Sequence, residues 1–427
     1  RYWHTLRHLR PVQFYGRLWF RFYHPKLDET GLGSIKLRQL KVNESGEHCI
    51  SLLDKQVGFP RFRQPSMLAS DRFRFLNETR DRVDAGTWND PAIDKLWLYN
   101  LHYFDDLNAQ NSEERFEWHS PLVQRWISEN PLGQGNGWEP YPTSLRIVNW
   151  IKWSLRFESK EASAFDWVSF HQSLALQARW LCRRLEFHLL GNHLFANAKA
   201  LVFAGVFFEG NEAERWRQTG SRLLTRELKE QMLPDGGHFE RSPMYHSILL
   251  EDVLDVIRLG QIYPKVLGDT LLELCSEKAR LMLAWLEQMT HPDGEISFFN
   301  DGAFGIAPKL SDLKSYAATV LCVQPKVSGY QRDKVGPNFR WLRDSGYVRL
   351  ESASAVALLD CAPIGPDYLP GHAHADTLSF ELSLFGQRVF VNGGTSRYGT
   401  DEVRHIERST AAHNTIEING ENSSEVW

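Results

Sequence analysis

The sequence contains few cysteines, and their spacing does not suit the usual cysteine-based sites. Its five cysteines are odd in number, lie far apart and never occur as Cys-x-x-Cys. A disulfide framework requires paired cysteines, and a cysteine zinc site requires closely spaced ones. We therefore expect neither of these features.

Long apolar runs and a strong charge of either sign are also missing. No stretch approaches the roughly 20 apolar residues that a membrane-spanning helix needs. The formal net charge is −4 over 427 residues, so nothing global predicts binding to nucleic acid or to a membrane surface. No signal peptide is visible, but the sequence starts at Arg1 rather than Met, so its absence is weak evidence about the compartment.

Aromatic residues, in contrast, are abundant, with 15 Trp, 13 Tyr and 25 Phe. Most of them are expected to fill cores, because the chain is long enough for two domains that each bury a core. A surplus of Trp and Tyr also suits a cleft in which aromatic rings stack on the apolar faces of sugars.

The apolar pattern divides the chain into three parts. Residues 1–90 are expected to form a helical or irregular segment, whose basic and aromatic start predicts an amphipathic helix. Packing of this helix on the main domain is favoured over membrane attachment. Residues 91–335 show a helical period without a fixed repeat, which predicts paired antiparallel helices rather than a regular solenoid. Residues 340–427 alternate with a period of two, which predicts antiparallel strands.

Helices followed by strands predict two segregated layers and not a doubly wound sheet. Only four or five strands are expected before Trp427, including one at Ile416 and Ile418 before the turn at Asn419-Gly420. Because this number is small for a sandwich, we expect that the sequence is a fragment of a longer protein.

The pair His372 and His374 is the strongest chemical feature of the sequence. The two residues stand at i and i+2 where a strand pattern begins, so both imidazoles are expected to face one site. Metal ligation is one reason for such a pair, and two exposed strand histidines are the alternative. His413 and Asn392 could add ligands, although a neutral amide oxygen binds zinc weakly.

Other candidates lie in the helical part. Asn192 follows a glycine and precedes an apolar helix, so a helix N-cap is its favoured interpretation. His193 alone is more often packed or exposed than functional. Pro243 suits a first helical turn and places Tyr245 at the start of a helix, where tyrosine is usually structural. With His372, these groups would suit an elimination that neutralises a carboxylate, removes a proton and protonates a leaving oxygen.

Two other functions stay open at this point. Glu139, Glu240 and Asp301 lie in loops and could support acid–base hydrolysis of a glycoside. A non-catalytic glycan-binding or assembly protein that has kept the cleft is the second alternative. Arg404 and Arg408 could each clamp a carboxylate or sulfate through two hydrogen bonds, and a surface salt bridge is an equal alternative for each.

Six sequence blocks, in the same order, resemble the heparinase II/III-like polysaccharide lyases. They span most of the chain from about residue 90. The blocks are Trp97–Phe104, Trp138–Pro142 with Arg146 and Asn149, Gly191–Leu194, Glu240–His246, Gly371–Asp376 and Arg408–Thr415.

The resemblance implies an incomplete (α/α) toroid followed by an antiparallel β-sandwich, with the active site in the cleft between them. It implies cleavage of a uronic-acid-containing glycan by β-elimination. Asn192, assisted by His193, would neutralise the substrate carboxylate. Tyr245 would be the acid and also a candidate base, and His372 would be the base or its partner.

The resemblance also implies a structural zinc and a set of substrate-binding residues, with no organic cofactor. His374 and His413 would hold the zinc, with Asn392 where relatives often have Asp. The substrate-binding set is Tyr99, Asn100, His102, Trp138, Arg146, Glu240, His246, Tyr398, Arg404 and Arg408. The expected partner is an acidic polysaccharide, such as a heparan-type, alginate-like or bacterial exopolysaccharide chain. A periplasmic or secreted location is expected, because relatives are mostly bacterial and many act outside the cytoplasm.

Overall fold

A computed structural model describes residues 6–27, 30–32, 35–39, 58–157, 165–321 and 338–426 of the chain. The chain divides into two compact units, and each is described by itself. The first, here called the helical unit, comprises residues 15–224 and 258–271. The second, here called the sheet unit, comprises residues 1–14, 225–257 and 272–427. The predicted end of the helical domain at residue 335 lies outside the described residues.

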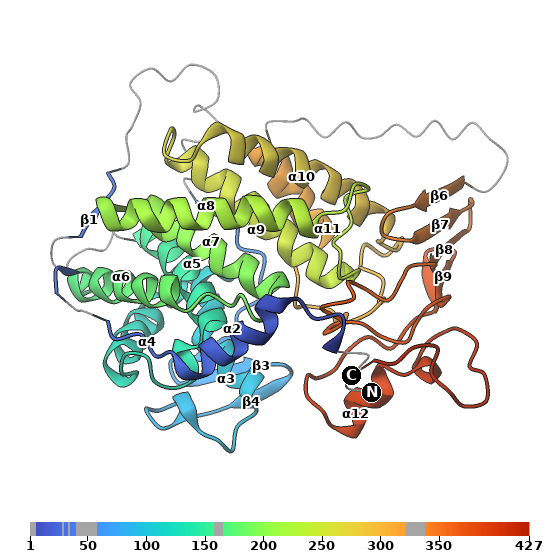
Figure 1. The fold of residues 1–427 in the computed structure, drawn as a ribbon, viewed down its shortest axis with the longest axis horizontal. Coiled ribbons are helices and arrows are strands. Elements are labelled where there is room, and N and C mark those ends of the chain that lie inside the picture. Colours follow the sequence, from blue (N-terminus) through green and yellow to red (C-terminus); the bar gives the residue numbers. More distant parts are fainter. Residues whose placement is uncertain are drawn as a thin grey trace. The chain divides into compact units, whose positions relative to one another are not determined.

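Helices dominate the helical unit, as the period of three to four residues predicts (Figure 1). Helix α5 packs against α3, α6 and α7, so it lies at the centre of this unit. The helices are α2 (Pro11–Phe22), α3 (Lys95–Tyr103), α4 (Phe116–Glu129), α5 (Pro140–Phe157), α6 (Trp167–Arg183), α7 (Gly191–Phe207) and α8 (Asn211–Gln231), of which α2 and α8 extend into the sheet unit.

Aromatic side chains fill the core of the helical unit. Trp150 packs edge-on against Phe104 and against Trp126, with ring centroids 5.5 Å apart in both pairs. Five tryptophans of this unit are less than 2% exposed, namely Trp88, Trp97, Trp126, Trp150 and Trp153. Each buried aromatic side chain contributes roughly 1.5–3 kcal/mol of transfer free energy. Core filling therefore accounts for much of the aromatic content, as expected.

Helices α7 and α8 approach each other closely at Gly205. A Cβ atom added there would lie 2.3 Å from the backbone nitrogen of Arg217 and 2.6 Å from the carbonyl oxygen of Ala213. Contacts of this length to backbone atoms cannot be relieved by a side-chain rotation. Gly205 is therefore required for the packing of these two helices.

Short strands also occur where the sequence predicts only helical or irregular structure. Strands β2 (Met67–Ala69), β3 (Arg72–Phe75) and β4 (Glu78–Arg80) form an antiparallel sheet, and β1 (Lys36–Leu37) pairs with β5 (Phe208–Glu209). They were not predicted because two to four residues are too few to display an alternating pattern.

The sheet unit combines three long helices with a five-stranded antiparallel sheet (Figure 1). The strand order is β10-β9-β8-β7-β6, so each strand pairs with its neighbours in sequence. The elements are α9 (Pro243–Ile262), α10 (Asp269–Gln288), α11 (Leu310–Val320), β6 (Asn338–Leu342), β7 (Tyr347–Glu351), β8 (Ala355–Asp360), β9 (Phe380–Leu384), β10 (Gln387–Phe390) and the short helix α12 (Glu402–Glu407).

The two faces of this sheet differ in burial. Tyr347 and Leu358 lie on one face and are fully buried. The opposite face is apolar and partly exposed, with Phe339 paired to Leu350 and Trp341 beside them. This alternation is typical of one layer of a sandwich.

Two details of the strand prediction need correction. The predicted strand at Ile416 and Ile418 is reduced to one isolated bridge between Ile418 and Glu421, and both isoleucines are exposed. His372 and His374 lie in an irregular segment before β9, not on a strand. Among the described residues, no helix is both long enough and apolar enough to cross a bilayer.

Candidate active site

His372 is held by a buried carboxylate in the sheet unit. Its Nδ1 atom lies 2.8 Å from Oδ2 of Asp301, whose residue is 0% exposed. Because Asp301 accepts this hydrogen bond, the neutral imidazole carries its proton on Nδ1 and its lone pair on Nε2. The ring of His372 is partly exposed, and its Nε2 atom points away from Asp301, toward Glu240.

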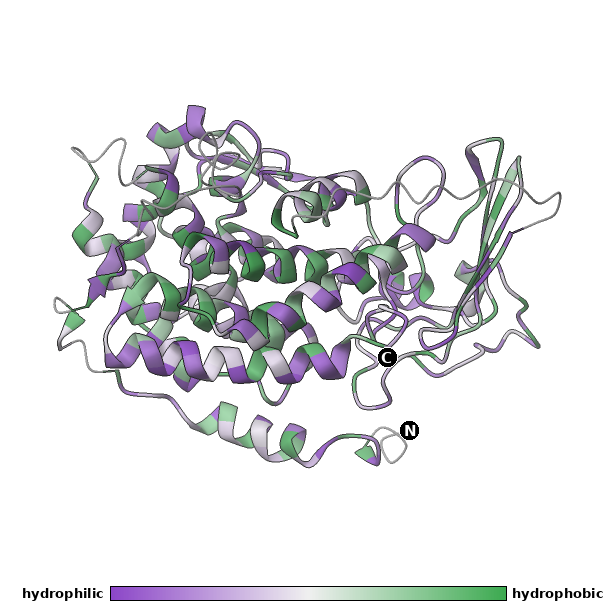
Figure 2. Ribbon diagram, turned by 90° about the horizontal axis from the view of Figure 1, so that it is seen from above, coloured by the Kyte–Doolittle hydropathy of each residue, from purple (hydrophilic) through white to green (hydrophobic). Residues whose placement is uncertain are grey.

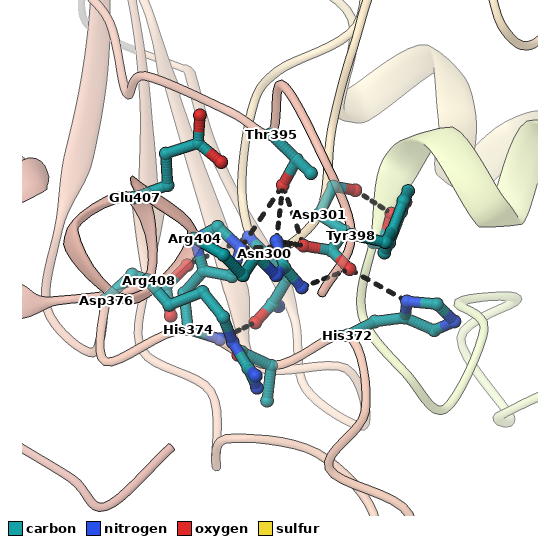
Figure 3. A network of polar contacts seen from close by, with 12 residues as sticks. Asn300, Asp301, His372, His374, Asp376, Thr395, Tyr398, Arg404, Glu407 and Arg408 are labelled. Carbon is teal, nitrogen blue, oxygen red and sulfur yellow. Dashed lines mark hydrogen bonds and ion pairs between the residues drawn. The ribbon is translucent and has the colours of Figure 1, made fainter. Parts of the chain in front are cut away.

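Asp301 is the centre of this network (Figure 3). Its Oδ1 atom lies 2.8 Å from Nε2 of His374 and accepts a hydrogen bond of 2.7 Å from Thr395. Arg404 donates from both terminal nitrogens, at 2.5 and 2.9 Å. His372 and His374 thus bind the two oxygens of one carboxylate, although neither residue lies on a strand.

The ionised form of Asp301 is strongly favoured. Burial alone would raise the pKa of this carboxyl. Hydrogen bonds from His372 and His374, the charge of His372 and a hydrogen bond from Arg404 outweigh burial and hold the pKa well below its ordinary value. Asp301 is therefore a fixed negative charge that orients both imidazoles.

Tyr245 lies directly against His372. The two ring centroids are 3.8 Å apart, and the rings are inclined by 31°. The hydroxyl of Tyr245 shares a hydrogen bond of 2.9 Å with the hydroxyl of Tyr398. A phenol, a second phenol and an imidazole therefore form one partly exposed group that can donate and accept protons.

The start of helix α9 positions Tyr245. The helix begins at Pro243, as the sequence predicts, and the Ser242 hydroxyl accepts a hydrogen bond of 3.2 Å from the backbone N–H of Tyr245. Ser242 also donates to the carbonyl oxygen of Asp301. The same serine thus caps the helix that carries the tyrosine and holds the loop that carries the carboxylate.

Glu240 is a buried neighbour of this group. Its Oε2 atom is 3.5 Å from Nε2 of His372, a distance at which charges interact but no hydrogen bond forms. The residue is 3% exposed. The geometry favours an electrostatic influence on His372 over direct contact with a substrate.

The predicted zinc ligands are only partly brought together. Nδ1 of His374 lies 3.2 Å from Nε2 of His413, so these nitrogens face each other. Asn392 is buried, and its amide oxygen accepts a hydrogen bond of 3.3 Å from the backbone of Asn414. Among the described residues, no group of three or more His, Cys, Asp or Glu side chains could hold a metal ion. Two imidazoles fall short of the three or four ligands that zinc prefers, so the set does not fit the ion.

Asn192 and His193 lie in the first turn of helix α7 in the helical unit. The N-cap of this helix is Leu190 and not Asn192, so the N-cap interpretation is wrong. Leu190 and Gly191 have φ values of 65° and 53°, and such a φ is rare for leucine. This backbone places Asn192 inside the first turn, where both it and His193 are partly exposed.

His193 has its own buried carboxylate, Glu186. The Nδ1 atom of His193 lies 3.2 Å from Oε1 of Glu186. Asn197 donates a hydrogen bond of 2.9 Å to the other oxygen and accepts one from the backbone N–H of Glu186. Tyr141 packs on the imidazole, with ring centroids 4.5 Å apart. The orientation of His193 is therefore fixed on two sides.

Tyr99 forms a second polar cluster in the helical unit. Its hydroxyl donates a short hydrogen bond to Oε2 of Glu139, and Lys95 forms an ion pair of 2.9 Å with the other oxygen. Burial, and then the charge of Glu139, raise the pKa of Tyr99 far above its ordinary value, so this phenol stays protonated. Asn100 is partly exposed, and its amide donates to the carbonyl of Leu96 at 2.8 Å.

Several residues predicted to bind substrate are instead packed inside the structure. His102 accepts from Trp126 at 3.0 Å and contacts the carbonyl of Trp88 at 2.9 Å. Burial, followed by the charge of Arg146, lowers the pKa of His102 to about 3. His102 is therefore a structural residue of the core, and the prediction that it binds substrate is wrong.

The same interpretation applies to the following four buried residues, whose partners lie within the fold. Arg146 is 0% exposed and donates to Gln177 and to the Gly137 carbonyl, at 2.9 and 2.8 Å. The remaining partners are the Asn130 carbonyl for Trp138, the Met282 carbonyl for His246, and the carbonyls of Ala373 and Pro370 for Arg408.

Arg404 is also buried, at 3% exposure, and binds Asp301 instead of a ligand. The clamp predicted for a substrate carboxylate or sulfate is thus formed with a carboxylate of the protein itself. Of the residues predicted to bind substrate, Tyr99, Asn100 and Tyr398 keep partly exposed side chains.

Sequence reasoning missed the roles of Asp301 and Glu186. The sequence suggests Asp301 only as a residue for the alternative hydrolytic reaction, and no motif marks Glu186. Each carboxylate orients a predicted histidine, across 71 residues for His372 and 7 residues for His193. The second spacing is short enough to have been noticed, whereas the first carries no local pattern.

Two family models match this chain. A model described as Heparinase II/III N-terminus matches residues 98–325, and one described as Heparinase II/III-like, C-terminal, matches residues 334–427. Together they cover most of the chain, including the group around Asp301 and His372 and the pair of Glu186 and His193.

Individual curated relatives also match this chain, at low sequence identity and over part of their own length. A heparin-sulfate lyase of Pedobacter heparinus is 28% identical over 325 residues, which are 70% of this chain and 47% of that protein. The FtsZ-localized protein C of Caulobacter vibrioides is 23% identical over 349 residues, or 79% of this chain and 54% of that protein. The chain thus spans about half the length of the curated relatives it matches.

A solved structure supports the fold. The crystal structure of heparinase III matches with a TM-score of 0.61 and 18% identity, covering 98% of this chain and 70% of that one. The likeness agrees with helices followed by an antiparallel sheet, the predicted toroid and sandwich architecture.

Proposed function

Because the chain belongs to the heparinase II/III-like family, we propose that it acts as a polysaccharide lyase on a uronic-acid-containing glycan. The observation that carries the proposal is the group formed by Asp301, His372 and Tyr245. Its imidazole is oriented by a buried carboxylate and stacked at 3.8 Å on a phenol. Such a pair supplies the base and the acid that an elimination needs.

His372 is proposed as the base. With Nδ1–H held by Asp301, the Nε2 lone pair is the group that takes the C5 proton of the uronate. Asp301 does not take up the proton, because its pKa lies well below the ordinary value. It keeps the ring in one tautomer and stabilises the imidazolium that forms.

Tyr245 is proposed as the acid that protonates the leaving O4 atom. Its hydroxyl is hydrogen-bonded to that of Tyr398 at 2.9 Å, so a proton lost by Tyr245 can be replaced through Tyr398. Elimination leaves a double bond between C4 and C5 of the new non-reducing end. Bond cleavage therefore needs no added water.

Asn192 and His193 are proposed to neutralise the substrate carboxylate. The C5 proton becomes acidic enough to remove only when the neighbouring carboxylate charge is muted. An amide in the first turn of a 17-residue helix suits this task, because the helix N-terminus also favours negative charge. Glu186 is the positioning residue for His193.

Zinc has no part in this proposal, because the donors near His374 and His413 are too few to hold it. The described donors number two imidazoles, with the Asn392 amide engaged elsewhere. No step of the proposed reaction depends on a metal.

The proposed substrate is an acidic polysaccharide, and the first polymer to test is heparan sulfate, because of the relatives named heparin-sulfate lyase. Alginate and bacterial exopolysaccharides that contain uronate complete the panel. A periplasmic or secreted location is part of the proposal, and fractionation of the native host would test it.

The decisive experiment measures absorbance near 232 nm while the protein acts on each polymer. An elimination produces unsaturated uronate ends that absorb there, whereas a hydrolase produces reducing ends without this absorbance. Tyr245→Phe is expected to lower the rate by a factor on the order of 10²–10⁴, which is typical of general acid–base catalysis.

Tyr15→Phe is the matched control, because Tyr15 is 62% exposed on helix α2 and belongs neither to the group around Asp301 nor to the pair of Glu186 and His193. Full activity of Tyr245→Phe would refute the assigned role. Reducing ends without absorbance would favour the hydrolase, and glycan binding without any product would favour a non-catalytic protein.

A further inference from the structure

Helix α2 (Pro11–Phe22) uses one face to pack on the helical unit. Phe20 lies against the ring of His188, with centroids 4.2 Å apart. Arg184 donates a hydrogen bond of 2.7 Å to the carbonyl of Phe20, and its guanidinium lies 3.6 Å from the Phe20 ring centroid. A Cβ atom at Gly16 would come within 3.1 Å of His188. This face anchors the helix, as the favoured interpretation of the sequence predicts.

The opposite face of α2 is apolar and exposed. Its five large side chains occur at positions i, i+1, i+4, i+5 and i+8, which share one side of a helix. Exposure ranges from 43% to 75% across Phe14, Tyr15, Leu18, Trp19 and Phe22. Both strongly hydrophobic and strongly hydrophilic residues are visible on this helix beside the N-terminus in Figure 2.

The segment around this face carries positive charge only. Residues 6–27 contain four arginines and one lysine, and no aspartate or glutamate, in a chain whose net charge is −4. Arg17 and Arg21 are exposed and form no ion pair with any other described residue. Two cations are thus available beside an exposed apolar face.

We propose that α2 is an interfacial helix that binds the surface of an anionic lipid bilayer. Trp19 and Tyr15 have an apolar body and a polar atom, which suits the boundary between headgroups and acyl chains. Leu18 and Phe22 enter the acyl layer beside them, while Arg17 and Arg21 contact the lipid phosphates.

Charge decides between a bilayer and other occupants of the face. A second copy would bring the same arginines to the interface, and these like charges would repel each other. An anionic bilayer offers apolar depth and negative charge together, which matches both features of α2. The inference does not depend on the proposed lyase activity.

Sedimentation with vesicles tests this inference on the full chain. Vesicles of phosphatidylcholine with 30% phosphatidylglycerol are compared with phosphatidylcholine alone. The wild-type protein is expected to sediment with the anionic vesicles at least tenfold more than with the neutral ones, and 0.5 M salt is expected to reduce binding severalfold.

Two double variants separate the contributions of the apolar face and the charge. Leu18→Ser with Trp19→Ser, and Arg17→Glu with Arg21→Glu, should each lower binding at least tenfold with unchanged melting temperature. Val168→Ser and Arg222→Glu are matched controls at exposed sites on α6 and α8, and both should bind as the wild type does.

Three outcomes would overturn the inference. They are an absence of binding to anionic vesicles, equal binding by both double variants and the wild type, and a change from dimer to monomer in the Leu18/Trp19 variant without vesicles. Light scattering after size exclusion detects the last outcome, which would assign the face to a second copy of the chain.

Discussion

Asp301→Asn removes one charge from the group around His372 and His374 in the sheet unit while keeping the size of the side chain. The aspartate accepts hydrogen bonds from Arg404, His372, His374 and Thr395. An asparagine amide of the same shape replaces one acceptor oxygen by a donor. It therefore faces existing N–H donors with another donor, and it leaves the guanidinium of Arg404 without its counter-charge.

The stability cost follows from the burial of that guanidinium. The side chain of Arg404 is 4% exposed, and removing one member of a buried ion pair costs roughly 3–5 kcal/mol. For a unit of this size the loss corresponds to a fall in melting temperature of about 10 °C. The unit should still fold, because domains commonly have 5–15 kcal/mol of stability.

The catalytic cost is separate from the stability cost. The neutral amide that Asp301→Asn introduces can no longer ensure that Nδ1 of His372 carries the proton, so the lone pair on Nε2 is lost in part of the molecules. The rate of elimination should fall by a factor on the order of 10²–10⁴. Absorbance assays well below the melting temperature measure this loss on folded protein.

Asp360→Asn is the matched control for a buried carboxyl. Burial, and then the charge of Asp376, raise the pKa of Asp360 well above its ordinary value, which favours the neutral form of this carboxyl. Its replacement should therefore lower the melting temperature less than Asp301→Asn does, because the neutral form is already the favoured one. Equal melting temperatures for wild type and Asp301→Asn, or equal rates, would refute the assigned role of Asp301.

Three further predictions concern the helical unit. Glu186→Gln should raise KM for the uronate polymer and lower kcat/KM by roughly 10-fold, because Glu186 orients His193; unchanged kinetics would contradict this. Gly205→Ala should lower stability by roughly 1–3 kcal/mol in urea unfolding, since the added methyl meets the Arg217 backbone. Burial lowers the pKa of His102 to about 3. As the pH is lowered from 6 to 4, the unfolded chain therefore binds a proton that the folded chain does not, and the free energy of unfolding falls by about 1.4 kcal/mol per pH unit. His102→Asn should remove this part of the pH dependence of the free energy of unfolding.

Much of the fold could be predicted because the relevant patterns are local. The apolar period of a helix can be read within the helix itself. The hairpin between β9 and β10 is indicated by Phe385-Gly386 in the sequence, and in the structure these residues have φ values of 51° and 82°. Two- to four-residue strands lack room for a pattern and were missed. The predicted domain borders stay predictions, since the two compact units follow contacts and not sequence order.

The chemistry of the site could be predicted only where a residue type was distinctive. His372 and Tyr245 stood out and do lie together. Arg146 stood out equally and proved to be part of the buried core, because an arginine that satisfies backbone carbonyls looks the same in sequence as one that binds a carboxylate. Burial is a property of the packed structure, and the sequence alone does not show it.

The two orienting carboxylates differ in a way that fits the two tasks. Asp301 has its charge balanced by the guanidinium of Arg404, whereas Glu186 accepts from the neutral amide of Asn197. A base that must take a proton benefits from a carboxylate that fixes its tautomer without adding net charge. A group proposed to mute a substrate carboxylate benefits from a carboxylate neighbour that favours positive charge on the imidazole. Under the proposed roles, the same carboxylate–histidine contact would thus serve proton removal around Asp301 and charge neutralisation around Glu186.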